Sequence, residues 1–310
     1  QRQVYCKKMR VVLASGSAHK DLYKEKLKSF AKGISICGEQ VFWHDFPKPS
    51  RYDAAVIYGS YKTYRGSGHH KVKTEIANTF PKYIQLETPI IGRIASTSDH
   101  GYLRVGVNGF LFDEAKWGFE YTDKNRYKKV FEYTGYNPNQ EWIKDGEHIL
   151  ILMQNPGDAS LRGQNIFEWA LNTVRTLKKH TDRKIIVRPH PLPRKGFDDF
   201  VKKVKRFKNV QLVENELPNN LRPLEKDFKN CFCAVSYSSG STVDAVLAGV
   251  PVLATDPGNM AWDVSTHELN KIESRYLGDR LEWMQKISMC QWSMEEFENG
   301  ECWNHIKKSL

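Results

Sequence analysis

The stretch VSYSSGSTVDAVLAGVPVLATD, residues 235–256, decides the fold class. An apolar strand over 232–237 runs into a turn of serines and glycine, a short helix is predicted over 242–247, and a second apolar strand follows at 251–254. Two buried strands joined by one helix predict a right-handed crossover and therefore parallel pairing. This unit is the building block of a doubly wound α/β domain.

The same alternation of strands and helices extends over most of the chain. Further strands are predicted at 10–15, 52–58, 82–86, 148–153, 184–188 and 210–213, and further helices at 20–30, 70–80, 166–177, 198–207 and 221–228. Residues 91–112 are irregular and glycine-rich, which indicates loops, and residues 136–146 favour a linker. We therefore predict an α/β fold with two Rossmann-like domains facing a cleft, residues 1–140 and 141–280, and a helical tail at 281–310.

Charge and composition narrow the class of partner. The 310-residue chain carries 47 Lys and Arg against 36 Asp and Glu, a formal net charge of +11, which favours a polyanion such as nucleic acid, an anionic membrane or a phosphorylated ligand. It has no apolar run of about 20 residues and no signal-peptide pattern, so a soluble, cytoplasmic protein without a membrane partner is expected. No CxxC or HExxH pattern occurs, so no metal site is expected.

Three strand ends in the second half carry polar residues, where an open parallel sheet binds its ligands. The candidate binding residues are Gln154, Asp158 and Ser160 after the first strand, Arg188 and His190 at the second, and Ser236, Ser238, Ser239, Gly240, Ser241, Thr242 and Asp244 at the third. A helix beginning at Ser241 or Thr242 presents unpaired backbone N–H groups and a positive dipole end, which together bind phosphate. The alternative is that Ser241 is only an N-cap, with Asp244 completing a capping box.

The histidine between two prolines is the second unusual feature. Pro189 and Pro191 hold His190 in a stiff, extended segment. An imidazole held rigidly at a strand end suits donation to a phosphate better than filling a core, although a lone histidine is more often structural.

These motifs resemble a known group of enzymes. "RPHP" at 188–191 and "SSGSTVDAVLAGVPVLATD" at 238–256 resemble the HP and serine motifs of bacterial capsule-polysaccharide and sialyltransferase-like glycosyltransferases of the GT-B fold. "QNPGDASLRG", "ETPIIGR", "GYLRVGVNGF" and "CQWSMEEFENGECWNHI" look like a related bacteriophage branch that glycosylates hydroxymethylated pyrimidines in DNA. The resemblance covers the second half well and the first half through short pieces.

The resemblance implies a nucleotide-sugar donor, expected to be UDP-linked, as co-substrate and no further cofactor. His190 would contact the donor phosphate, with Ser238, Ser239 and Ser241 around it, and Arg188 would add positive charge. Asp244 is the nearest counterpart of the acidic residue that holds a donor ribose. The resemblance also implies that helices in 281–310 return to the first domain. The acidic-acidic-glycine base motif of the sialyltransferases is missing.

Sugar transfer to a hydroxyl needs a group that takes its proton. Glu87 is the first candidate, because it ends the strand "KYIQLE" just before Pro89. The alternative role for Glu87 is an ion pair with Arg93 or Arg104. Asp99 and His100, in the following polar stretch, are the second candidates, and Asp113 is the third.

The stretch "YKTYRGSGHHKVK", residues 61–73, points to the acceptor. Basic side chains follow phosphates and aromatic rings stack on bases, so the stretch favours DNA; the alternative is a mobile surface loop. The candidate acceptor-binding residues are Lys62, Arg65, His69, His70, Lys71 and Lys73, with Arg93, Tyr102 and Arg104 from further along the chain. A DNA-modifying enzyme must also extrude its target base.

Four hypotheses follow. The first is a glycosyltransferase that moves a sugar from a nucleotide donor to the hydroxymethyl group of a modified pyrimidine in DNA. The second keeps the enzyme and makes the acceptor a capsule or lipid-linked glycan. The third is a nucleotide-sugar epimerase, which would release a changed free sugar without an acceptor. The fourth is a non-catalytic DNA-binding protein.

Overall fold

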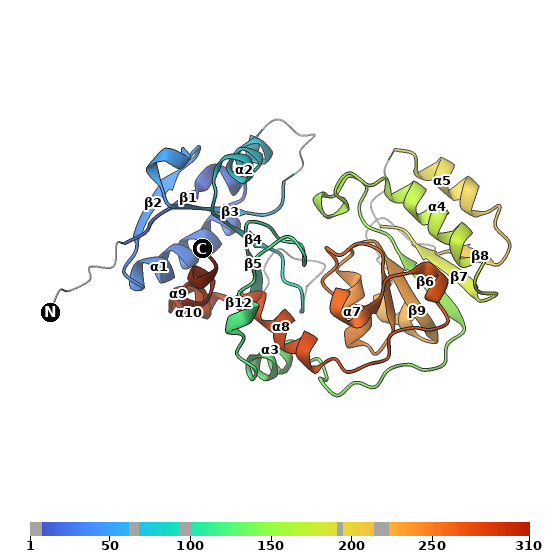
Figure 1. Ribbon diagram of the computed structural model, residues 1–310. Helices are drawn as coiled ribbons and strands as arrows, with labels where there is room; N and C mark the ends of the chain where they lie inside the picture. The colour runs from blue at the N-terminus through green and yellow to red at the C-terminus, as the bar shows by residue number, and fades with distance from the viewer. Residues whose placement is uncertain (1–7, 62–67, 93–100, 191–194, 214–222) are drawn as a thin grey trace. The chain divides into compact units, whose positions relative to one another are not determined.

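Two six-stranded sheets organise the protein (Figure 1). The computed structural model describes residues 8–61, 68–92, 101–190, 195–213 and 223–310. The chain divides into two units: the first contains residues 1–110, 114–130 and 285–310, and the second contains 111–113 and 131–284. The domain limits expected from the sequence stay a prediction.

The first unit is built on a mainly parallel sheet. Its strands are β1 (Arg10–Ala14), β2 (Gln40–His44), β3 (Ala54–Tyr58), β4 (Tyr83–Glu87), β5 (Tyr102–Val107) and β12 (Gln291–Ser293). Their order is β12-β5-β4-β3-β1-β2, with β5 and β12 antiparallel to their neighbours and the rest parallel. The chain first crosses from β1 to β2 on one side of β1, and then from β2 to β3 on the other side. This change of direction creates a topological switch point between β1 and β3.

Helices cover both faces of this sheet (Figure 1). The helices of the first unit are α1 (Asp21–Ile36), α2 (Gly68–Thr79), α9 (Met294–Glu298) and α10 (Glu301–Ile306), while α3 (Arg126–Thr134) and α8 (Leu281–Met289) include the borders between the units. Val11 and Leu13 pack with α1 and the C-terminal helices, whereas Val12 and Ala14 pack with α2. This alternation follows from the two-residue period of a strand that is buried on both faces.

The second unit has an entirely parallel sheet. Its strands are β6 (His148–Leu152), β7 (Lys184–Arg188), β8 (Val210–Leu212), β9 (Cys231–Ser236), β10 (Val252–Ala254) and β11 (Ser265–Thr266), and its helices are α4 (Ile166–Leu177), α5 (Phe197–Val204), α6 (Leu224–Phe228) and α7 (Ser241–Leu247). The order β11-β10-β9-β6-β7-β8 places the switch point between β6 and β9. The predicted α/β class with two Rossmann-like sheets is confirmed.

Four strands depart from the sequence-based expectation, among them the two-residue β11. β2 was not predicted, because its residues are mostly exposed at the sheet edge and show no clean alternation. β5 lies in a region expected to form loops, where Gly106 hides the strand pattern; a Cβ at this position would come within 2.3 Å of the Gly109 carbonyl oxygen. β12 interrupts the tail expected to be helical and pairs with β5.

The C-terminal segment belongs to the core of the first unit. Trp292, on β12, and Trp303, on α10, are both buried in the cluster that includes Phe30 of α1. Arg126 lies over the Trp292 ring at 3.9 Å and forms a buried ion pair with Glu296. These contacts fix residues 285–310 to the sheet of the first unit.

Candidate functional site

The loops that follow β6 and β9 meet at the switch point of the second unit. Gln154, two residues after β6, is buried, and its Nε2 donates to Ser160 Oγ at 2.6 Å and to Ser238 Oγ at 3.0 Å. Its Oε1 accepts from the Ser238 amide at 3.0 Å, and Ser238 Oγ donates to the Ser160 carbonyl at 2.6 Å. Asp158 completes the network by accepting from the amide and hydroxyl of Ser160. The structure thus brings four of the predicted residues together.

The turn into α7 is held by the first serines of its motif. Ser236 Oγ accepts from the Ser239 amide at 3.1 Å, and Ser239 Oγ accepts from the Ser241 amide at 3.3 Å. Gly240 is the N-cap and no side chain caps the helix, so the alternative that Ser241 and Asp244 form a capping box is wrong. Gly240 is exposed and Ser241 half-buried, which leaves this part of the turn accessible to an anion.

A second strand-end loop is joined to the same turn. Thr242 Oγ1 lies 2.5 Å from the Ser239 carbonyl and 2.8 Å from Asn259 Oδ1. Asn259, in the loop after β10, also binds the Ala261 amide and the Tyr237 carbonyl. Thr242 is therefore a buried connector between two loops, and its predicted contact with the donor stays a prediction.

Arg188 and His190 follow the neighbouring strand. Arg188 ends β7, and its guanidinium forms an ion pair with the buried carboxylate of Asp227 on α6. Part of its positive charge is thus balanced within the unit. His190 is half-buried two residues beyond the strand end, as the sequence places it. Donor contacts of both residues stay predictions.

Sequence reasoning missed an ion-pair cluster that joins the loop after β6 to the residues after β10. Arg162, whose φ of 50° lies in the left-handed region, binds both carboxylate oxygens of Asp113 and lies 3.4 Å from Asp256 Oδ1. Burial, and then the hydrogen bond to Asp256, raise the pKa of Tyr237 to about 12. The left-handed conformation of Arg162 is that of the residue that ends the short helix Ala159–Leu161. Arg162 and Asp113 are 49 positions apart in the sequence, so no local sequence pattern predicts that they pair.

This cluster also bears on Asp113 as a base. Both carboxylate oxygens of Asp113 accept hydrogen bonds from Arg162, and its predicted role as a base stays a prediction. Asp244, the predicted ribose-binding residue, is half-buried on α7 with its Oδ1 3.5 Å from the Tyr136 hydroxyl. Its role also stays a prediction.

Glu87 lies at the end of β4, as expected, but its carboxylate is held firmly. Oε2 accepts from the Ser60 amide at 2.6 Å and Oε1 from the Thr88 amide at 2.8 Å. Burial alone raises the pKa of Glu87, but Arg104, the two amides and Lys73 outweigh it, so the pKa lies below its ordinary value. A carboxylate held in this way is ionised yet weakly basic. The alternative role of Glu87, as the charge partner of Arg104, gains support because the two residues are paired across β4 and β5.

The predicted acceptor residues divide into three groups. Lys62, Arg65 and Arg93 lie outside the described ranges, as do Asp99 and His100, the second candidates for the base. Lys71 is exposed on α2, and the half-buried His69 and His70 have their ring centroids 4.0 Å apart. Lys73 and Tyr102 are buried, each 3% exposed, and their predicted contact with the acceptor stays a prediction. Lys73 shares the buried face of α2 with Val72 and Ile76, a helical spacing that the sequence already contained.

Arg104 binds locally within the first unit. Its Nη1 donates to the Phe110 carbonyl at 2.9 Å, and its guanidinium carbon lies 5.5 Å from the centroid of the Phe110 ring. The residue is half-buried on β5 beside Glu87. These contacts hold the Arg104 side chain at the end of the sheet. Its predicted contact with the acceptor stays a prediction.

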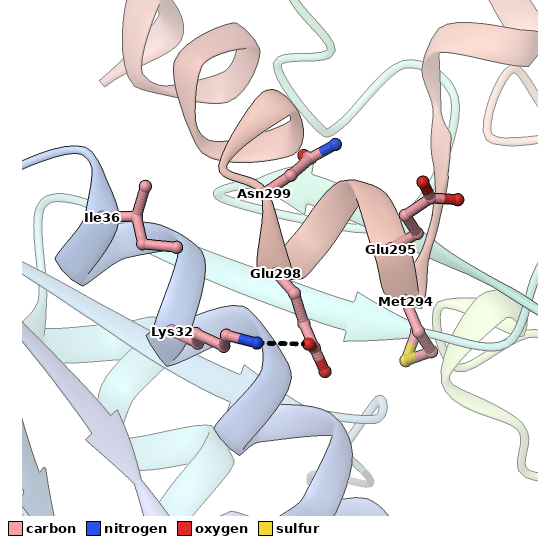
Figure 2. Close-up of a pocket in the computed structure, with 6 residues that line it drawn as sticks. All are labelled: Lys32, Ile36, Met294, Glu295, Glu298 and Asn299. Atoms are coloured by element: carbon pink, nitrogen blue, oxygen red, sulfur yellow. Dashed lines mark hydrogen bonds and ion pairs between the residues drawn. The ribbon is translucent and has the colours of Figure 1, made fainter.

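A surface hollow of about 440 Å³ lies between α1 and α9 (Figure 2). The Lys32 ammonium on α1 lies 2.7 Å from Glu298 Oε2 on α9 across it. The hollow lies on helices rather than at strand ends, and the ion pair bridges the two helices across it. It belongs to helix packing and not to the predicted site.

Two kinds of feature are absent from the described residues. No group of three or more His, Cys, Asp or Glu there has the arrangement of a metal site. Within the same ranges, every helix is too short or too polar to cross a bilayer.

Comparison with known proteins shows likeness in structure alone. No protein-family model matches the chain, and no curated protein does. The solved "Thermosulfurimonas dismutans KpsC, beta Kdo 2,4 transferase" is similar at 13% identity and a TM-score of 0.55, over 93% of this chain and 92% of that one. The "beta Kdo 2,7 transferase" of the same organism's KpsC is similar at 14% identity and a TM-score of 0.53, over 95% and 99%. At these identities the likeness shows a shared fold, and it confirms the predicted GT-B class.

Proposed function

We propose that the protein is a glycosyltransferase that takes a sugar from a nucleotide-sugar donor held by the second unit. The observation that carries this proposal is the hydrogen-bonded junction of the β6 and β9 loops at the switch point, where open α/β sheets bind nucleotides. The accessible turn at Gly240 and Ser241 offers the Gly240 amide to a phosphate, and His190 lies at the adjoining strand end. The GT-B fold is compatible with this chemistry but does not assign it.

For the acceptor, we propose the hydroxymethyl group of a modified pyrimidine in DNA. The support is the formal charge of +11, together with the exposed Lys71 and the basic stretch before it. The step joins the acceptor oxygen to the anomeric carbon of the sugar. The bond between that carbon and the donor phosphate oxygen breaks, and the electron pair leaves with the nucleotide.

The test is incubation of the protein with a panel of nucleotide sugars and hydroxymethylated DNA, followed by nucleoside mass spectrometry. A hexose or related mass added to the modified nucleoside, and absent with unmodified DNA, is the expected result. His190→Ala serves as the matched variant, since it should lower turnover while DNA binding persists. Absence of any added mass across the panel would overturn the DNA acceptor.

A saccharide acceptor is the second candidate. It is favoured by the likeness to two structures named as Kdo transferases, each matched over most of both chains. The same donor panel with oligosaccharide acceptors, read by mass spectrometry, separates the two candidates. Release of an altered free sugar without any acceptor would instead identify an epimerase.

A further inference from the structure

The first unit has its own cluster of titratable side chains at its switch point. β1 ends at Ala14 and β3 at Tyr58, and the loop between β1 and α1 carries His19. α2 packs against this loop and brings His69, His70 and Lys73 to the same place. Ligands of an open α/β sheet bind beyond such strand ends, so this cluster lies where an acceptor held by the first unit would be bound.

Rings on two elements hold the His19 side chain. The His19 and His69 rings are stacked, with centroids 4.1 Å apart and planes 19° from parallel. Tyr23 contacts His19 edge-on at 5.2 Å, and Tyr23 itself stacks on Tyr58 at 4.3 Å. Aromatic contacts of these kinds fix the orientation of a ring without using its polar atoms.

The imidazole ring of His19 is accessible to a substrate. The residue is exposed, and among the described residues no hydrogen bond of its ring nitrogens is seen. Burial, then Lys73, then Lys20 lower its pKa below 6.5. The titratable groups around it are Lys20, the residue before α1, Tyr23 on α1, and His69, His70 and Lys73 on α2. At neutral pH the ring is therefore neutral and able to accept a proton.

Glu87 offers the opposite combination. Each of its carboxylate oxygens already accepts a backbone amide, and Arg104 and Lys73 stabilise its charge. Taking up a proton would weaken all of these interactions at once. Burial lowers the pKa of Lys73 to about 8, although the nearby charge of Glu87 opposes this shift. The charge of Lys73 in turn lowers the pKa of His19. Glu87 and Lys73 are thus positioning residues.

We propose that His19 is the general base of the reaction, a role that rests on the proposed glycosyl transfer. The acceptor hydroxyl gives its proton to a ring nitrogen of His19 as its oxygen bonds to the anomeric carbon of the sugar. The bond from that carbon to the donor phosphate breaks, and its electron pair leaves with the nucleotide. The imidazolium then returns the proton to water. The substrate class is an acceptor with an ionisable hydroxyl, bound at the strand ends of the first unit.

The test compares His19→Gln with His44→Gln, an exposed histidine of the same unit on the edge strand β2. With the donor and acceptor identified by mass spectrometry, we expect His19→Gln to lower kcat by about 10²–10⁴-fold with little change in KM. Donor binding measured by calorimetry should be unchanged, and added imidazole should restore part of the rate. His44→Gln should behave like the wild type. Because His19 is exposed, thermal melting should show that its variant stays folded.

The pH profile separates a base from a merely structural residue. Turnover should fall as pH drops through the His19 pKa, because protonated imidazole accepts no proton. Lys20→Gln and Lys73→Met each remove a like charge, so each should raise the His19 pKa and move this limb to higher pH. Nuclear magnetic resonance titration of the ring measures the same shift without any substrate.

The outcomes are distinct. Two results would overturn the role of His19 while glycosyl transfer stands. The first is a full kcat in His19→Gln. The second is a loss of kcat that imidazole does not restore, together with a pH limb that is unchanged in Lys20→Gln. If the wild-type protein transfers sugar to no acceptor, the proposed function fails and takes this role with it. Low kcat, rescue and a moved limb together support His19 as the base.

Discussion

Replacement of Glu296 by glutamine should destabilise the first unit by an amount that depends on pH. The Glu296 carboxylate is buried and binds Arg126 through two hydrogen bonds, one of 2.7 Å. Lys129 lies 3.1 Å from Oε1, and the Ser293 amide donates to Oε2 at 2.8 Å. Burial by itself raises the Glu296 pKa, but Arg126, the Ser293 amide and Lys129 outweigh it and lower the pKa to about 2 from 4.5.

The magnitude follows from this shift. A difference of about 2.5 pH units, at about 1.36 kcal/mol each, corresponds to about 3 kcal/mol of folding free energy. Because the pKa is lower in the folded state, the contribution is complete above about pH 5 and is lost as pH falls toward 2. Roughly half of it remains at pH 3. Glu296→Gln should therefore lower the free energy of unfolding by about 3 kcal/mol at pH 7 and by about half of that at pH 3.

Urea denaturation of both proteins, followed by tryptophan fluorescence at the two pH values, measures these differences. The control is Glu298→Gln on the same helix, whose exposed ion pair with Lys32 should contribute little. A destabilisation by Glu296→Gln that is the same at both pH values would refute the electrostatic reasoning. So would equal effects of the two substitutions at pH 7.

Three further outcomes are expected. Gln154→Leu removes three hydrogen bonds, two of which join the β6 and β9 loops, so it should cost about 2–4 kcal/mol in urea denaturation and weaken donor binding in calorimetry. The control Gln164→Leu, at an exposed position, should do neither. Gly33→Ala places a Cβ 1.8 Å from the Phe297 carbonyl oxygen, so thermal melting should show a loss of about 1–3 kcal/mol; an unchanged melting temperature would contradict the α1–α9 packing. A variant with neutral replacements at Lys62, Arg65 and Lys71 tests whether the basic stretch binds DNA. If it does, the KM for DNA should rise while the donor affinity stays constant. Each lost phosphate contact should also flatten the salt dependence of DNA binding by about one unit of logarithmic slope.

Local patterns in the sequence were enough to place most helices and strands. The predicted helix 166–177 and strand 184–188 coincide with α4 and β7, and the polar strand ends lie where they were expected. This works because a buried helix or strand repeats its apolar residues with a short period set by its own backbone geometry. The serine turn after β9 was visible for the same reason, since its residues are neighbours in the chain.

Only the tertiary structure decided which side chains remain available for chemistry. His19 and His69 are 50 positions apart and become neighbours through the packing of α2 against the β1 loop. Glu87 seemed an open carboxylate by sequence, yet it is bound by the amides of Ser60 and Thr88. Charge, burial and hydrogen bonding act through space over a few ångströms, so they depend on strand order and register. The sequence by itself determined the elements and their polar ends, and the fold assigned those ends their partners.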